Sequence, residues 1–285
     1  MAGRTPLGPG RRPQIPPPLT LKPKWGGRVA ETTHAPAGSA EASVSSLDRG
    51  QASGEGLTSD RLRDRMVARL RQQGIQDETV LRAMQTIPRH IFVDPGLASR
   101  AYEDSALPIG HSQTISQPYV VARAIALARM LLGAPEAKQP SLGHRPRRIL
   151  EIGGGCGYQA AVLSLVFGEV YSVERIEGLH LQARRNLFPL ALPNLHLLHA
   201  DGLSLPGDLG PFQAIFLAAG MPSIPEHLLR ELEPGGVLVA PIGAPTQRLV
   251  VIRSLATGLA DRSPDYERRE FEEVSFVPIL RGIQS

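Results

Sequence analysis

The stretch Ile149–Ala161 reads ILEIGGGCGYQAA, and it decides the fold class of this chain. With the two residues before it, it gives RRILEIGG, which predicts a buried strand, and YQAAVLSLVFG predicts the helix that follows. Gly153, Gly155 and Gly157 lie between them, where they let the backbone turn tightly and approach a ligand closely. A purely structural turn would use the same glycines, so the stretch alone predicts a strand–turn–helix unit and leaves its ligand open.

Apolar strands and helical segments alternate along the rest of the chain. Helices are expected at 158–168, 177–190 and 222–236, and further strands at 169–176, 194–202, 212–220, 237–243, 248–255 and 272–280. This alternation predicts an α/β fold with a doubly wound, mostly parallel seven-stranded sheet and helices on both faces. The last two strands have no full helix between them, so one edge of the sheet is expected to be antiparallel.

The residues before 58 differ in composition from the rest. Residues 1–57 are rich in Pro, Gly and Ser and cannot bury enough apolar surface to offset chain entropy, so we expect a disordered tail. One folded domain is expected over 58–285, with N-terminal helices and a loop-rich segment at 58–146 and an α/β core at 147–285. The first helix is expected after a cap at Thr58 or Ser59.

The composition favours a reducing compartment. Cys156 is the only cysteine, and no apolar run approaches the roughly 18 residues of a membrane span. The formal net charge is +4, but residues 1–59 hold seven Lys or Arg against four Asp or Glu, so most of the excess lies in the tail. The eight histidines show no metal-ligand spacing. We therefore expect a cytoplasmic monomer that binds no membrane, nucleic acid or metal.

The spacing of the glycines separates two kinds of cofactor. A dinucleotide fingerprint G-x-G-x-x-G would begin at Gly153, but its third small position falls on Tyr158. The pattern that fits is E-x-G-x-G-x-G, which begins at Glu151. An acid before the glycines, and no glycine where a pyrophosphate must pass, suits a cofactor that lacks phosphates and has a cationic amino-acid end. S-adenosylmethionine has these properties.

Two further acids follow the next two predicted strands. Glu174 ends the second strand, where a carboxylate can accept ribose hydroxyl groups. Asp201, beside Gly202, ends the third strand, where a carboxylate can accept a proton of the adenine amino group. Either acid alone would be an ordinary solvated strand end. Together with Glu151 they predict a cofactor site at the carboxyl ends of the strands.

A polar run precedes a predicted helix in the stretch Ala106–Arg123, ALPIGHSQTISQPYVVAR. Ser116 fits an ordinary helix N-cap, because Pro118 falls in the first turn and the residues after it have an apolar face. The run holds more hydroxyl and amide groups than a cap needs. A substrate-binding role for Ser116 therefore stays open beside the cap.

Four segments, in order and spacing, resemble the protein-L-isoaspartate (D-aspartate) O-methyltransferases: RHIFVDP, AYEDSALPIGHSQTISQPY, LEIGGGCGYQAAVL and LEPGGVLVAPIG. The resemblance runs from about Leu57 to the C-terminus, and the second segment is the most diagnostic. The glycine loop departs from the family's usual GTGSG, because Gly154 and Cys156 replace two hydroxyl residues. This departure concerns cofactor affinity and leaves the fold unaffected.

The resemblance implies a class I, Rossmann-like methyltransferase domain over 58–285. It implies methyl transfer from S-adenosylmethionine to the α-carboxyl of L-isoaspartyl, and less well D-aspartyl, residues of damaged proteins, followed by a succinimide. Ser116 would be catalytic, with Thr114, Ile115 and Gln117 flanking the substrate. His111 is either a substrate contact or a hydrogen-bonded loop histidine.

Three alternatives to this interpretation are a different methyl acceptor, a nicotinamide oxidoreductase and a module that only binds S-adenosylmethionine. A small molecule or a nucleic acid could accept the methyl group, although LAAGMPSIP after the fourth strand lacks the acid-or-amide-Pro-Pro-aromatic box of amino-methylating nucleic-acid enzymes. Tyr158 opposes a nicotinamide oxidoreductase. The intact TIS segment opposes a module that merely binds S-adenosylmethionine.

Overall fold

The computed structural model describes residues 55–133, 148–205, 209–255 and 265–285. Nearly all of the expected tail lies outside these ranges. The first helix begins at Glu55, three residues before the expected start of the domain. Ser59 therefore lies inside this helix and is not its cap, so that prediction was wrong.

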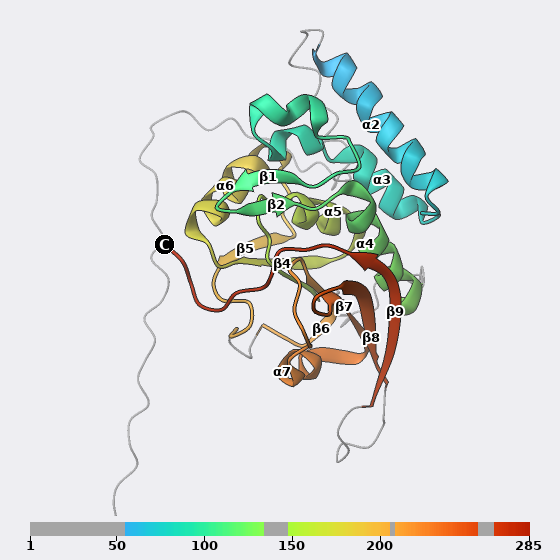
Figure 1. The fold of residues 1–285 in the computed structure, drawn as a ribbon, viewed down its shortest axis with the longest axis vertical. Coiled ribbons are helices and arrows are strands. Elements are labelled where there is room, and N and C mark those ends of the chain that lie inside the picture. The colour runs from blue at the N-terminus through green and yellow to red at the C-terminus, as the bar shows by residue number, and fades with distance from the viewer. Residues whose placement is uncertain (1–54, 134–147, 206–208, 256–264) are drawn as a thin grey trace, which may run out of the picture. The chain divides into compact units, whose positions relative to one another are not determined.

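A seven-stranded sheet forms the centre of the fold, in the order β5-β4-β3-β6-β7-β8-β9 (Figure 1). Its strands are β3 (Arg148–Ile152), β4 (Glu169–Glu174), β5 (Leu195–His199), β6 (Phe212–Leu217), β7 (Leu232–Ile242), β8 (Gln247–Ser254) and β9 (Tyr266–Val274). The first five are parallel, whereas β8 pairs antiparallel with both β7 and β9. The mostly parallel sheet with one antiparallel edge is thus confirmed.

Helices cover both faces of this sheet. The helices are α2 (Glu55–Gln72), α3 (Glu78–Thr86), α4 (Pro118–Leu132), α5 (Tyr158–Val166), α6 (Glu177–Leu187) and α7 (Glu226–Arg230). Side chains of α2 to α6 share one apolar core with alternate residues of the strands, and the remaining strand residues pack with α7 on the other face. Strand residues such as Leu150 and Ile149 therefore point to opposite cores, as the period of a strand requires.

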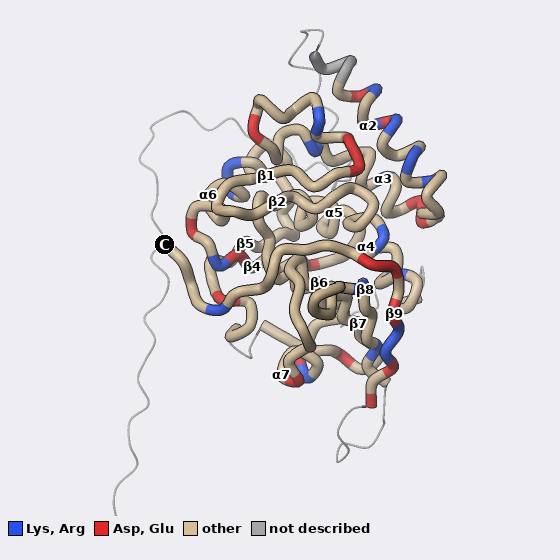
Figure 2. The backbone as a smooth tube through the Cα atoms, viewed as in Figure 1, with Lys and Arg blue, Asp and Glu red and all other residues tan. Residues whose placement is uncertain are grey.

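Two predicted elements near the C-terminus were misplaced. The helix expected over 222–236 is only the five-residue α7, because Pro222 and Pro225 precede it and Leu232 already pairs with Phe212 in the sheet. The last strand is the charged segment of β9, not 272–280. As an edge strand, β9 carries acidic and basic residues, several of them exposed. Figure 2 marks both kinds of residue along its backbone.

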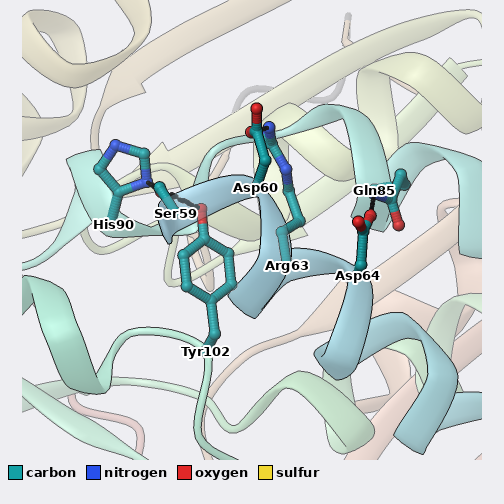
Figure 3. A network of polar contacts seen from close by, with 7 residues as sticks. All are labelled: Ser59, Asp60, Arg63, Asp64, Gln85, His90 and Tyr102. Atoms are coloured by element: carbon teal, nitrogen blue, oxygen red, sulfur yellow. Dashed lines mark hydrogen bonds and ion pairs between the residues drawn. The ribbon is translucent and has the colours of Figure 1, made fainter. Parts of the chain in front are cut away.

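A polar cluster joins α2 to Gln85, His90 and Tyr102 of the segment that follows it in the chain (Figure 3). The Ser59 hydroxyl lies 2.8 Å from His90 Nδ1, and the same nitrogen lies 2.8 Å from the Tyr102 hydroxyl. Burial raises the pKa of Tyr102. Asp64 of α2 accepts a hydrogen bond from Gln85 of α3. These contacts, with the buried face of α2, hold the N-terminal helices against the core.

A short hairpin, which the sequence did not indicate, presents the polar run of residues 111–117. It consists of β1 (Leu107–Gly110) and β2 (Gln113–Ile115), paired antiparallel. Helix α4 follows, with Gln117 at its N-cap position and no side-chain cap from that residue. The interpretation of Ser116 as the helix N-cap was therefore wrong. The predicted apolar face of α4 is confirmed, since Val121, Ala124, Ile125 and Ala128 are buried.

Candidate active site

Two narrow pockets and a wider groove lie at the carboxyl ends of the strands, where the strand order reverses between β3 and β6. The outer pocket, of about 50 Å³, is lined by Gly153, Glu174, Ile176, Asp201, Gly202 and Ile279, among others. The inner pocket, of about 40 Å³, is lined by Ile115, Ser116, Glu151, Gly153, Gly155 and Gln159, among others. The groove, of about 700 Å³, is lined by Thr114, Ser116, Gln117, Ala218, Gln247 and Phe276, among others.

The inner pocket and the groove meet at one place. Thr114, Ser116 and Ala218 line both of them. Gly153 in turn lines both the inner and the outer pocket. A ligand that extends through the two pockets would therefore end within reach of a second ligand in the groove, and the polar residues at the junction are Thr114 and Ser116.

The polar side chains at this junction are uncommitted. Among the described residues, no partner hydrogen-bonds the hydroxyls of Thr114 and Ser116 or the amide of Gln117. Ser116 and Gln117 are half-buried and Thr114 is exposed. These three neutral donors are available to a ligand in the groove. Ile115 differs, because its side chain is buried and lines only the inner pocket.

Glu151 places a carboxyl group in the wall of the inner pocket. Its side chain is wholly buried, and Oε2 accepts a 2.5 Å hydrogen bond from the Ser172 hydroxyl on β4. Burial raises the pKa of Glu151 to about 7, with opposing effects of the Ser172 and Gln159 side chains and a further rise from the charge of Glu174. Oε1 has no hydrogen-bond partner among the described residues. A buried carboxylate oxygen without a partner fits the cationic amino-acid end of a ligand.

Glu174 and Asp201 lie together in the outer pocket, as predicted. Glu174 accepts hydrogen bonds from the backbone N–H groups of Gly155 (2.9 Å) and Ile176 (2.8 Å), so it also ties the glycine loop to β4. Asp201 accepts from the N–H of Gly282 at 2.8 Å, which fastens the C-terminal segment across the pocket.

Two predicted site residues lie elsewhere. Gly157 lines neither pocket, because it is the N-cap residue of α5 and faces α6. The ring of His111 packs on Gly178 of α6 so closely that a side chain at that glycine would collide with His111 Nε2. His111 lines neither the groove nor either pocket. His111 and Ser112 form the turn of the hairpin, both with positive φ, 51° and 55°.

Replacing Gly157 by alanine should destabilise the fold more than the same change at Gly74. Both residues have φ near +90°, which costs a non-glycine residue about 1–2 kcal/mol. At Gly157 the new Cβ would also lie 2.7 Å from Leu187, whereas at Gly74 nothing lies within 4 Å. We expect urea unfolding to show a loss of about 2–4 kcal/mol for Gly157→Ala. Equal losses in the two variants would contradict the tight packing of the glycine loop on α6.

Sequence reasoning missed two residues that hold this site from behind. Arg89 donates to the Ser116 carbonyl, and Asp104 accepts from the N–H of Tyr119 on α4. Neither is near Ser116 in the sequence, and no spacing pattern could have joined them to it.

Cys156 is buried, and burial raises the pKa of its thiol to about 11, which argues against a nucleophilic role.

Known proteins resemble this chain over most of its length. The family model of the protein-L-isoaspartate(D-aspartate) O-methyltransferases matches residues 61–284. A protein-L-isoaspartate O-methyltransferase of Bordetella petrii is 53% identical over 238 residues, which are 83% of this chain and 81% of that protein. One from Bordetella parapertussis is 49% identical over 275 residues, which are 93% and 98% of the two chains.

Solved structures share the fold. A Plasmodium falciparum structure assigned to the protein-L-isoaspartate O-methyltransferases, in complex with S-adenosyl-L-homocysteine, has a TM-score of 0.62 at 23% identity and covers 75% of this chain and 95% of its own. A second protein-L-isoaspartate O-methyltransferase has a TM-score of 0.62 at 26% identity and covers 78% of this chain and 67% of its own. By its family match and its close relatives, this chain belongs to the protein-L-isoaspartate(D-aspartate) O-methyltransferase family.

Proposed function

We propose that this chain transfers a methyl group from S-adenosylmethionine to the α-carboxyl of L-isoaspartyl, and less readily D-aspartyl, residues of damaged proteins. The amide nitrogen of the following residue then attacks the ester carbonyl and displaces methanol, which closes a succinimide, and hydrolysis of this ring returns part of the residue to normal aspartate. Besides family membership, the observation that carries the proposal is the junction at Ser116, where the inner pocket opens into the groove.

The two pockets fit the parts of S-adenosylmethionine by their chemistry. The carboxylates of Glu174 and Asp201 suit the ribose hydroxyls and the adenine amino group, and Gly202 lines the same pocket. The free oxygen of Glu151 suits the cationic amino-acid end, beside Gly153 and Gly155. When bound, S-adenosylmethionine supplies an electrophilic methyl carbon, which forms a bond to a carboxylate oxygen while the bonding electron pair stays on sulfur.

The chain's own residues have to orient the substrate and exclude water. An α-carboxyl with a pKa near 3.5 is already ionised at neutral pH, so the reaction needs no general base. Ser116 and Thr114 supply neutral donors at the junction. The described lining of the groove holds no Lys or Arg. Arg248 of β8 lies 3.8 Å from the groove residue Glu273, and Arg123 of α4 is paired with Glu272 at 2.8 Å. Neutral donors orient a carboxylate while stabilising its charge less than a buried Lys or Arg would, so the carboxylate keeps more of its reactivity.

The lining of the groove argues against a nucleic-acid substrate. It includes Glu273 and no Lys or Arg side chain. Binding to a nucleic acid depends on basic side chains that contact phosphates.

Among the described residues no helix is long and apolar enough to cross a membrane. The cytoplasmic location and the monomeric state remain proposals, and the mass of the protein in solution would check the second.

Labelled S-adenosylmethionine tests the reaction type. We expect the purified protein to label an isoaspartyl peptide, and we expect mild base to release that label as methanol, because it is held as an ester. A parallel reaction with RNA should give no label. Base-stable label on the peptide, or label on RNA, would overturn carboxyl methylation as the activity.

A further inference from the structure

Two side chains hold the turn that presents Ser116. Arg89 reaches it from one side, with Nη2 donating to the Ser116 carbonyl (2.7 Å) and Nε donating to the Ala101 carbonyl (2.7 Å). Asp104 reaches the other side, with Oδ1 accepting from the backbone N–H of Tyr119 (3.0 Å). The turn between β2 and α4 is therefore fixed at a carbonyl before Pro118 and at an N–H after it.

The Arg89 guanidinium is an unusual group to find in the core. Its side chain is wholly buried and lies over the ring of Tyr158, with Cζ 4.7 Å from the ring centroid. No Asp or Glu of the described residues lies within ion-pair distance of it, and burial lowers its pKa. An apolar residue would fill this space without desolvating a charge. The planar fork of arginine can instead bridge two carbonyls in fixed directions, which a lysine cannot do.

Asp104 caps the N-terminus of α4, the role that the sequence had left open for Ser116. The first N–H groups of a helix need acceptors, and in α4 neither Ser116 nor Gln117 supplies a side-chain one. Asp104, from the loop before β1, accepts the Tyr119 N–H and places a negative charge at the N-terminus of α4. The hydroxyl of Ser116 is thereby left without an internal partner, at the junction of the inner pocket and the groove.

We infer that Arg89 and Asp104 are positioning residues for methyl transfer. Together they set the direction of the Ser116 hydroxyl, and neither touches the substrate. The inference rests on the proposed function, since it assigns the turn to the methyl-transfer step. An error of about 1 Å in the placement of reacting groups can cost about 100-fold in rate, so a loosened turn should lower kcat before it affects binding.

Four variants test the inference. Arg89→Lys keeps the charge but loses the planar fork whose separate nitrogens donate to the two carbonyls. Asp104→Ala removes the cap, and Asp104→Asn keeps an acceptor. Leu238→Ala, in the core on the opposite face of the sheet, is the control for lost stability. Each variant is assayed on an isoaspartyl peptide well below its Tm, for kcat, KM and the Kd of S-adenosylmethionine. Hydrogen exchange at the Tyr119 amide reports the hydrogen bond from this N–H to Asp104, independently of activity.

We expect Arg89→Lys and Asp104→Ala to lower kcat about 10- to 100-fold, with KM and Kd within about threefold of wild type. Asp104→Asn should recover most of the kcat, and Leu238→Ala should lower Tm only. The Tyr119 amide should exchange faster in Asp104→Ala alone. Unchanged kcat in Arg89→Lys with a lowered Tm, or unchanged exchange in Asp104→Ala, would overturn the inference. An inactive wild-type enzyme with the expected exchange would instead overturn the proposed function.

Discussion

Ser116→Ala should lower kcat about 100-fold at saturating peptide and cofactor, while the Kd of S-adenosylmethionine stays within about twofold. The hydroxyl stands at the junction of the inner pocket and the groove, where it can hold one oxygen of a carboxylate and leave the other free to attack. No described group bonds this hydroxyl, so its loss should leave the free energy of unfolding nearly unchanged. Timed, quenched reactions measure kcat, and calorimetry of the same preparation measures the Kd of S-adenosylmethionine and the stability.

Ser105→Ala, in the loop before β1, is the matched control and should keep wild-type kcat. A serine that caps a helix costs about 1 kcal/mol when replaced by alanine. A loss of that size in Ser116→Ala, together with a normal kcat, would return Ser116 to a structural role. An increase in Kd equal to the fall in kcat would place Ser116 among the cofactor contacts instead.

Glu151→Gln should make the free protein more stable at pH 8 and bind S-adenosylmethionine about 10- to 100-fold more weakly there. Burial raises the pKa of Glu151 to about 7, above its ordinary value of 4.5. Between these two pH values the folded protein keeps a proton that the unfolded chain releases. Stability therefore falls as pH rises through this window, by on the order of 3 kcal/mol in all, and glutamine removes that loss.

The cationic end of the cofactor favours the ionised form of Glu151, so the dependence of binding on pH has the opposite sign. Affinity in the wild type should rise with pH up to about 7 and then level off, with release of a proton on binding. In Glu151→Gln the affinity should be flat, and the two proteins should bind alike near pH 5. Isothermal titration in buffers of different ionisation enthalpy counts the proton. A wild-type affinity that is independent of pH would remove Glu151 from the cofactor site.

The sheet was predictable because parallel strands buried on both faces are apolar runs, and β3 to β8 each lie within a predicted segment or overlap one. The errors fall where local pattern and tertiary pairing disagree. Segment 272–280 is apolar enough for a strand. Its second half crosses the site instead, and there Pro278 forms an isolated β-bridge with Gly220. The charged β9 is held by pairing with β8, which its own sequence does not reveal.

Part of the candidate site was also predictable from the sequence, and part was not. Acids at successive strand ends are predictable, because the carboxyl ends of parallel strands meet at one edge, and Glu151, Glu174 and Asp201 do line the two pockets there. The turn at Ser116 is different. Whether its hydroxyl caps α4 depends on Asp104, which reaches the helix only through tertiary packing.

The most direct test of the account compares two peptides of identical sequence, one with L-isoaspartate and one with L-aspartate at the same position. The assay measures kcat/KM for formation of base-labile methyl ester with each peptide. We predict that the isoaspartyl peptide is methylated and that the aspartyl peptide gives no signal above background. Equal rates on the two peptides, or no ester on either, would contradict the assignment of this chain as an isoaspartyl carboxyl methyltransferase.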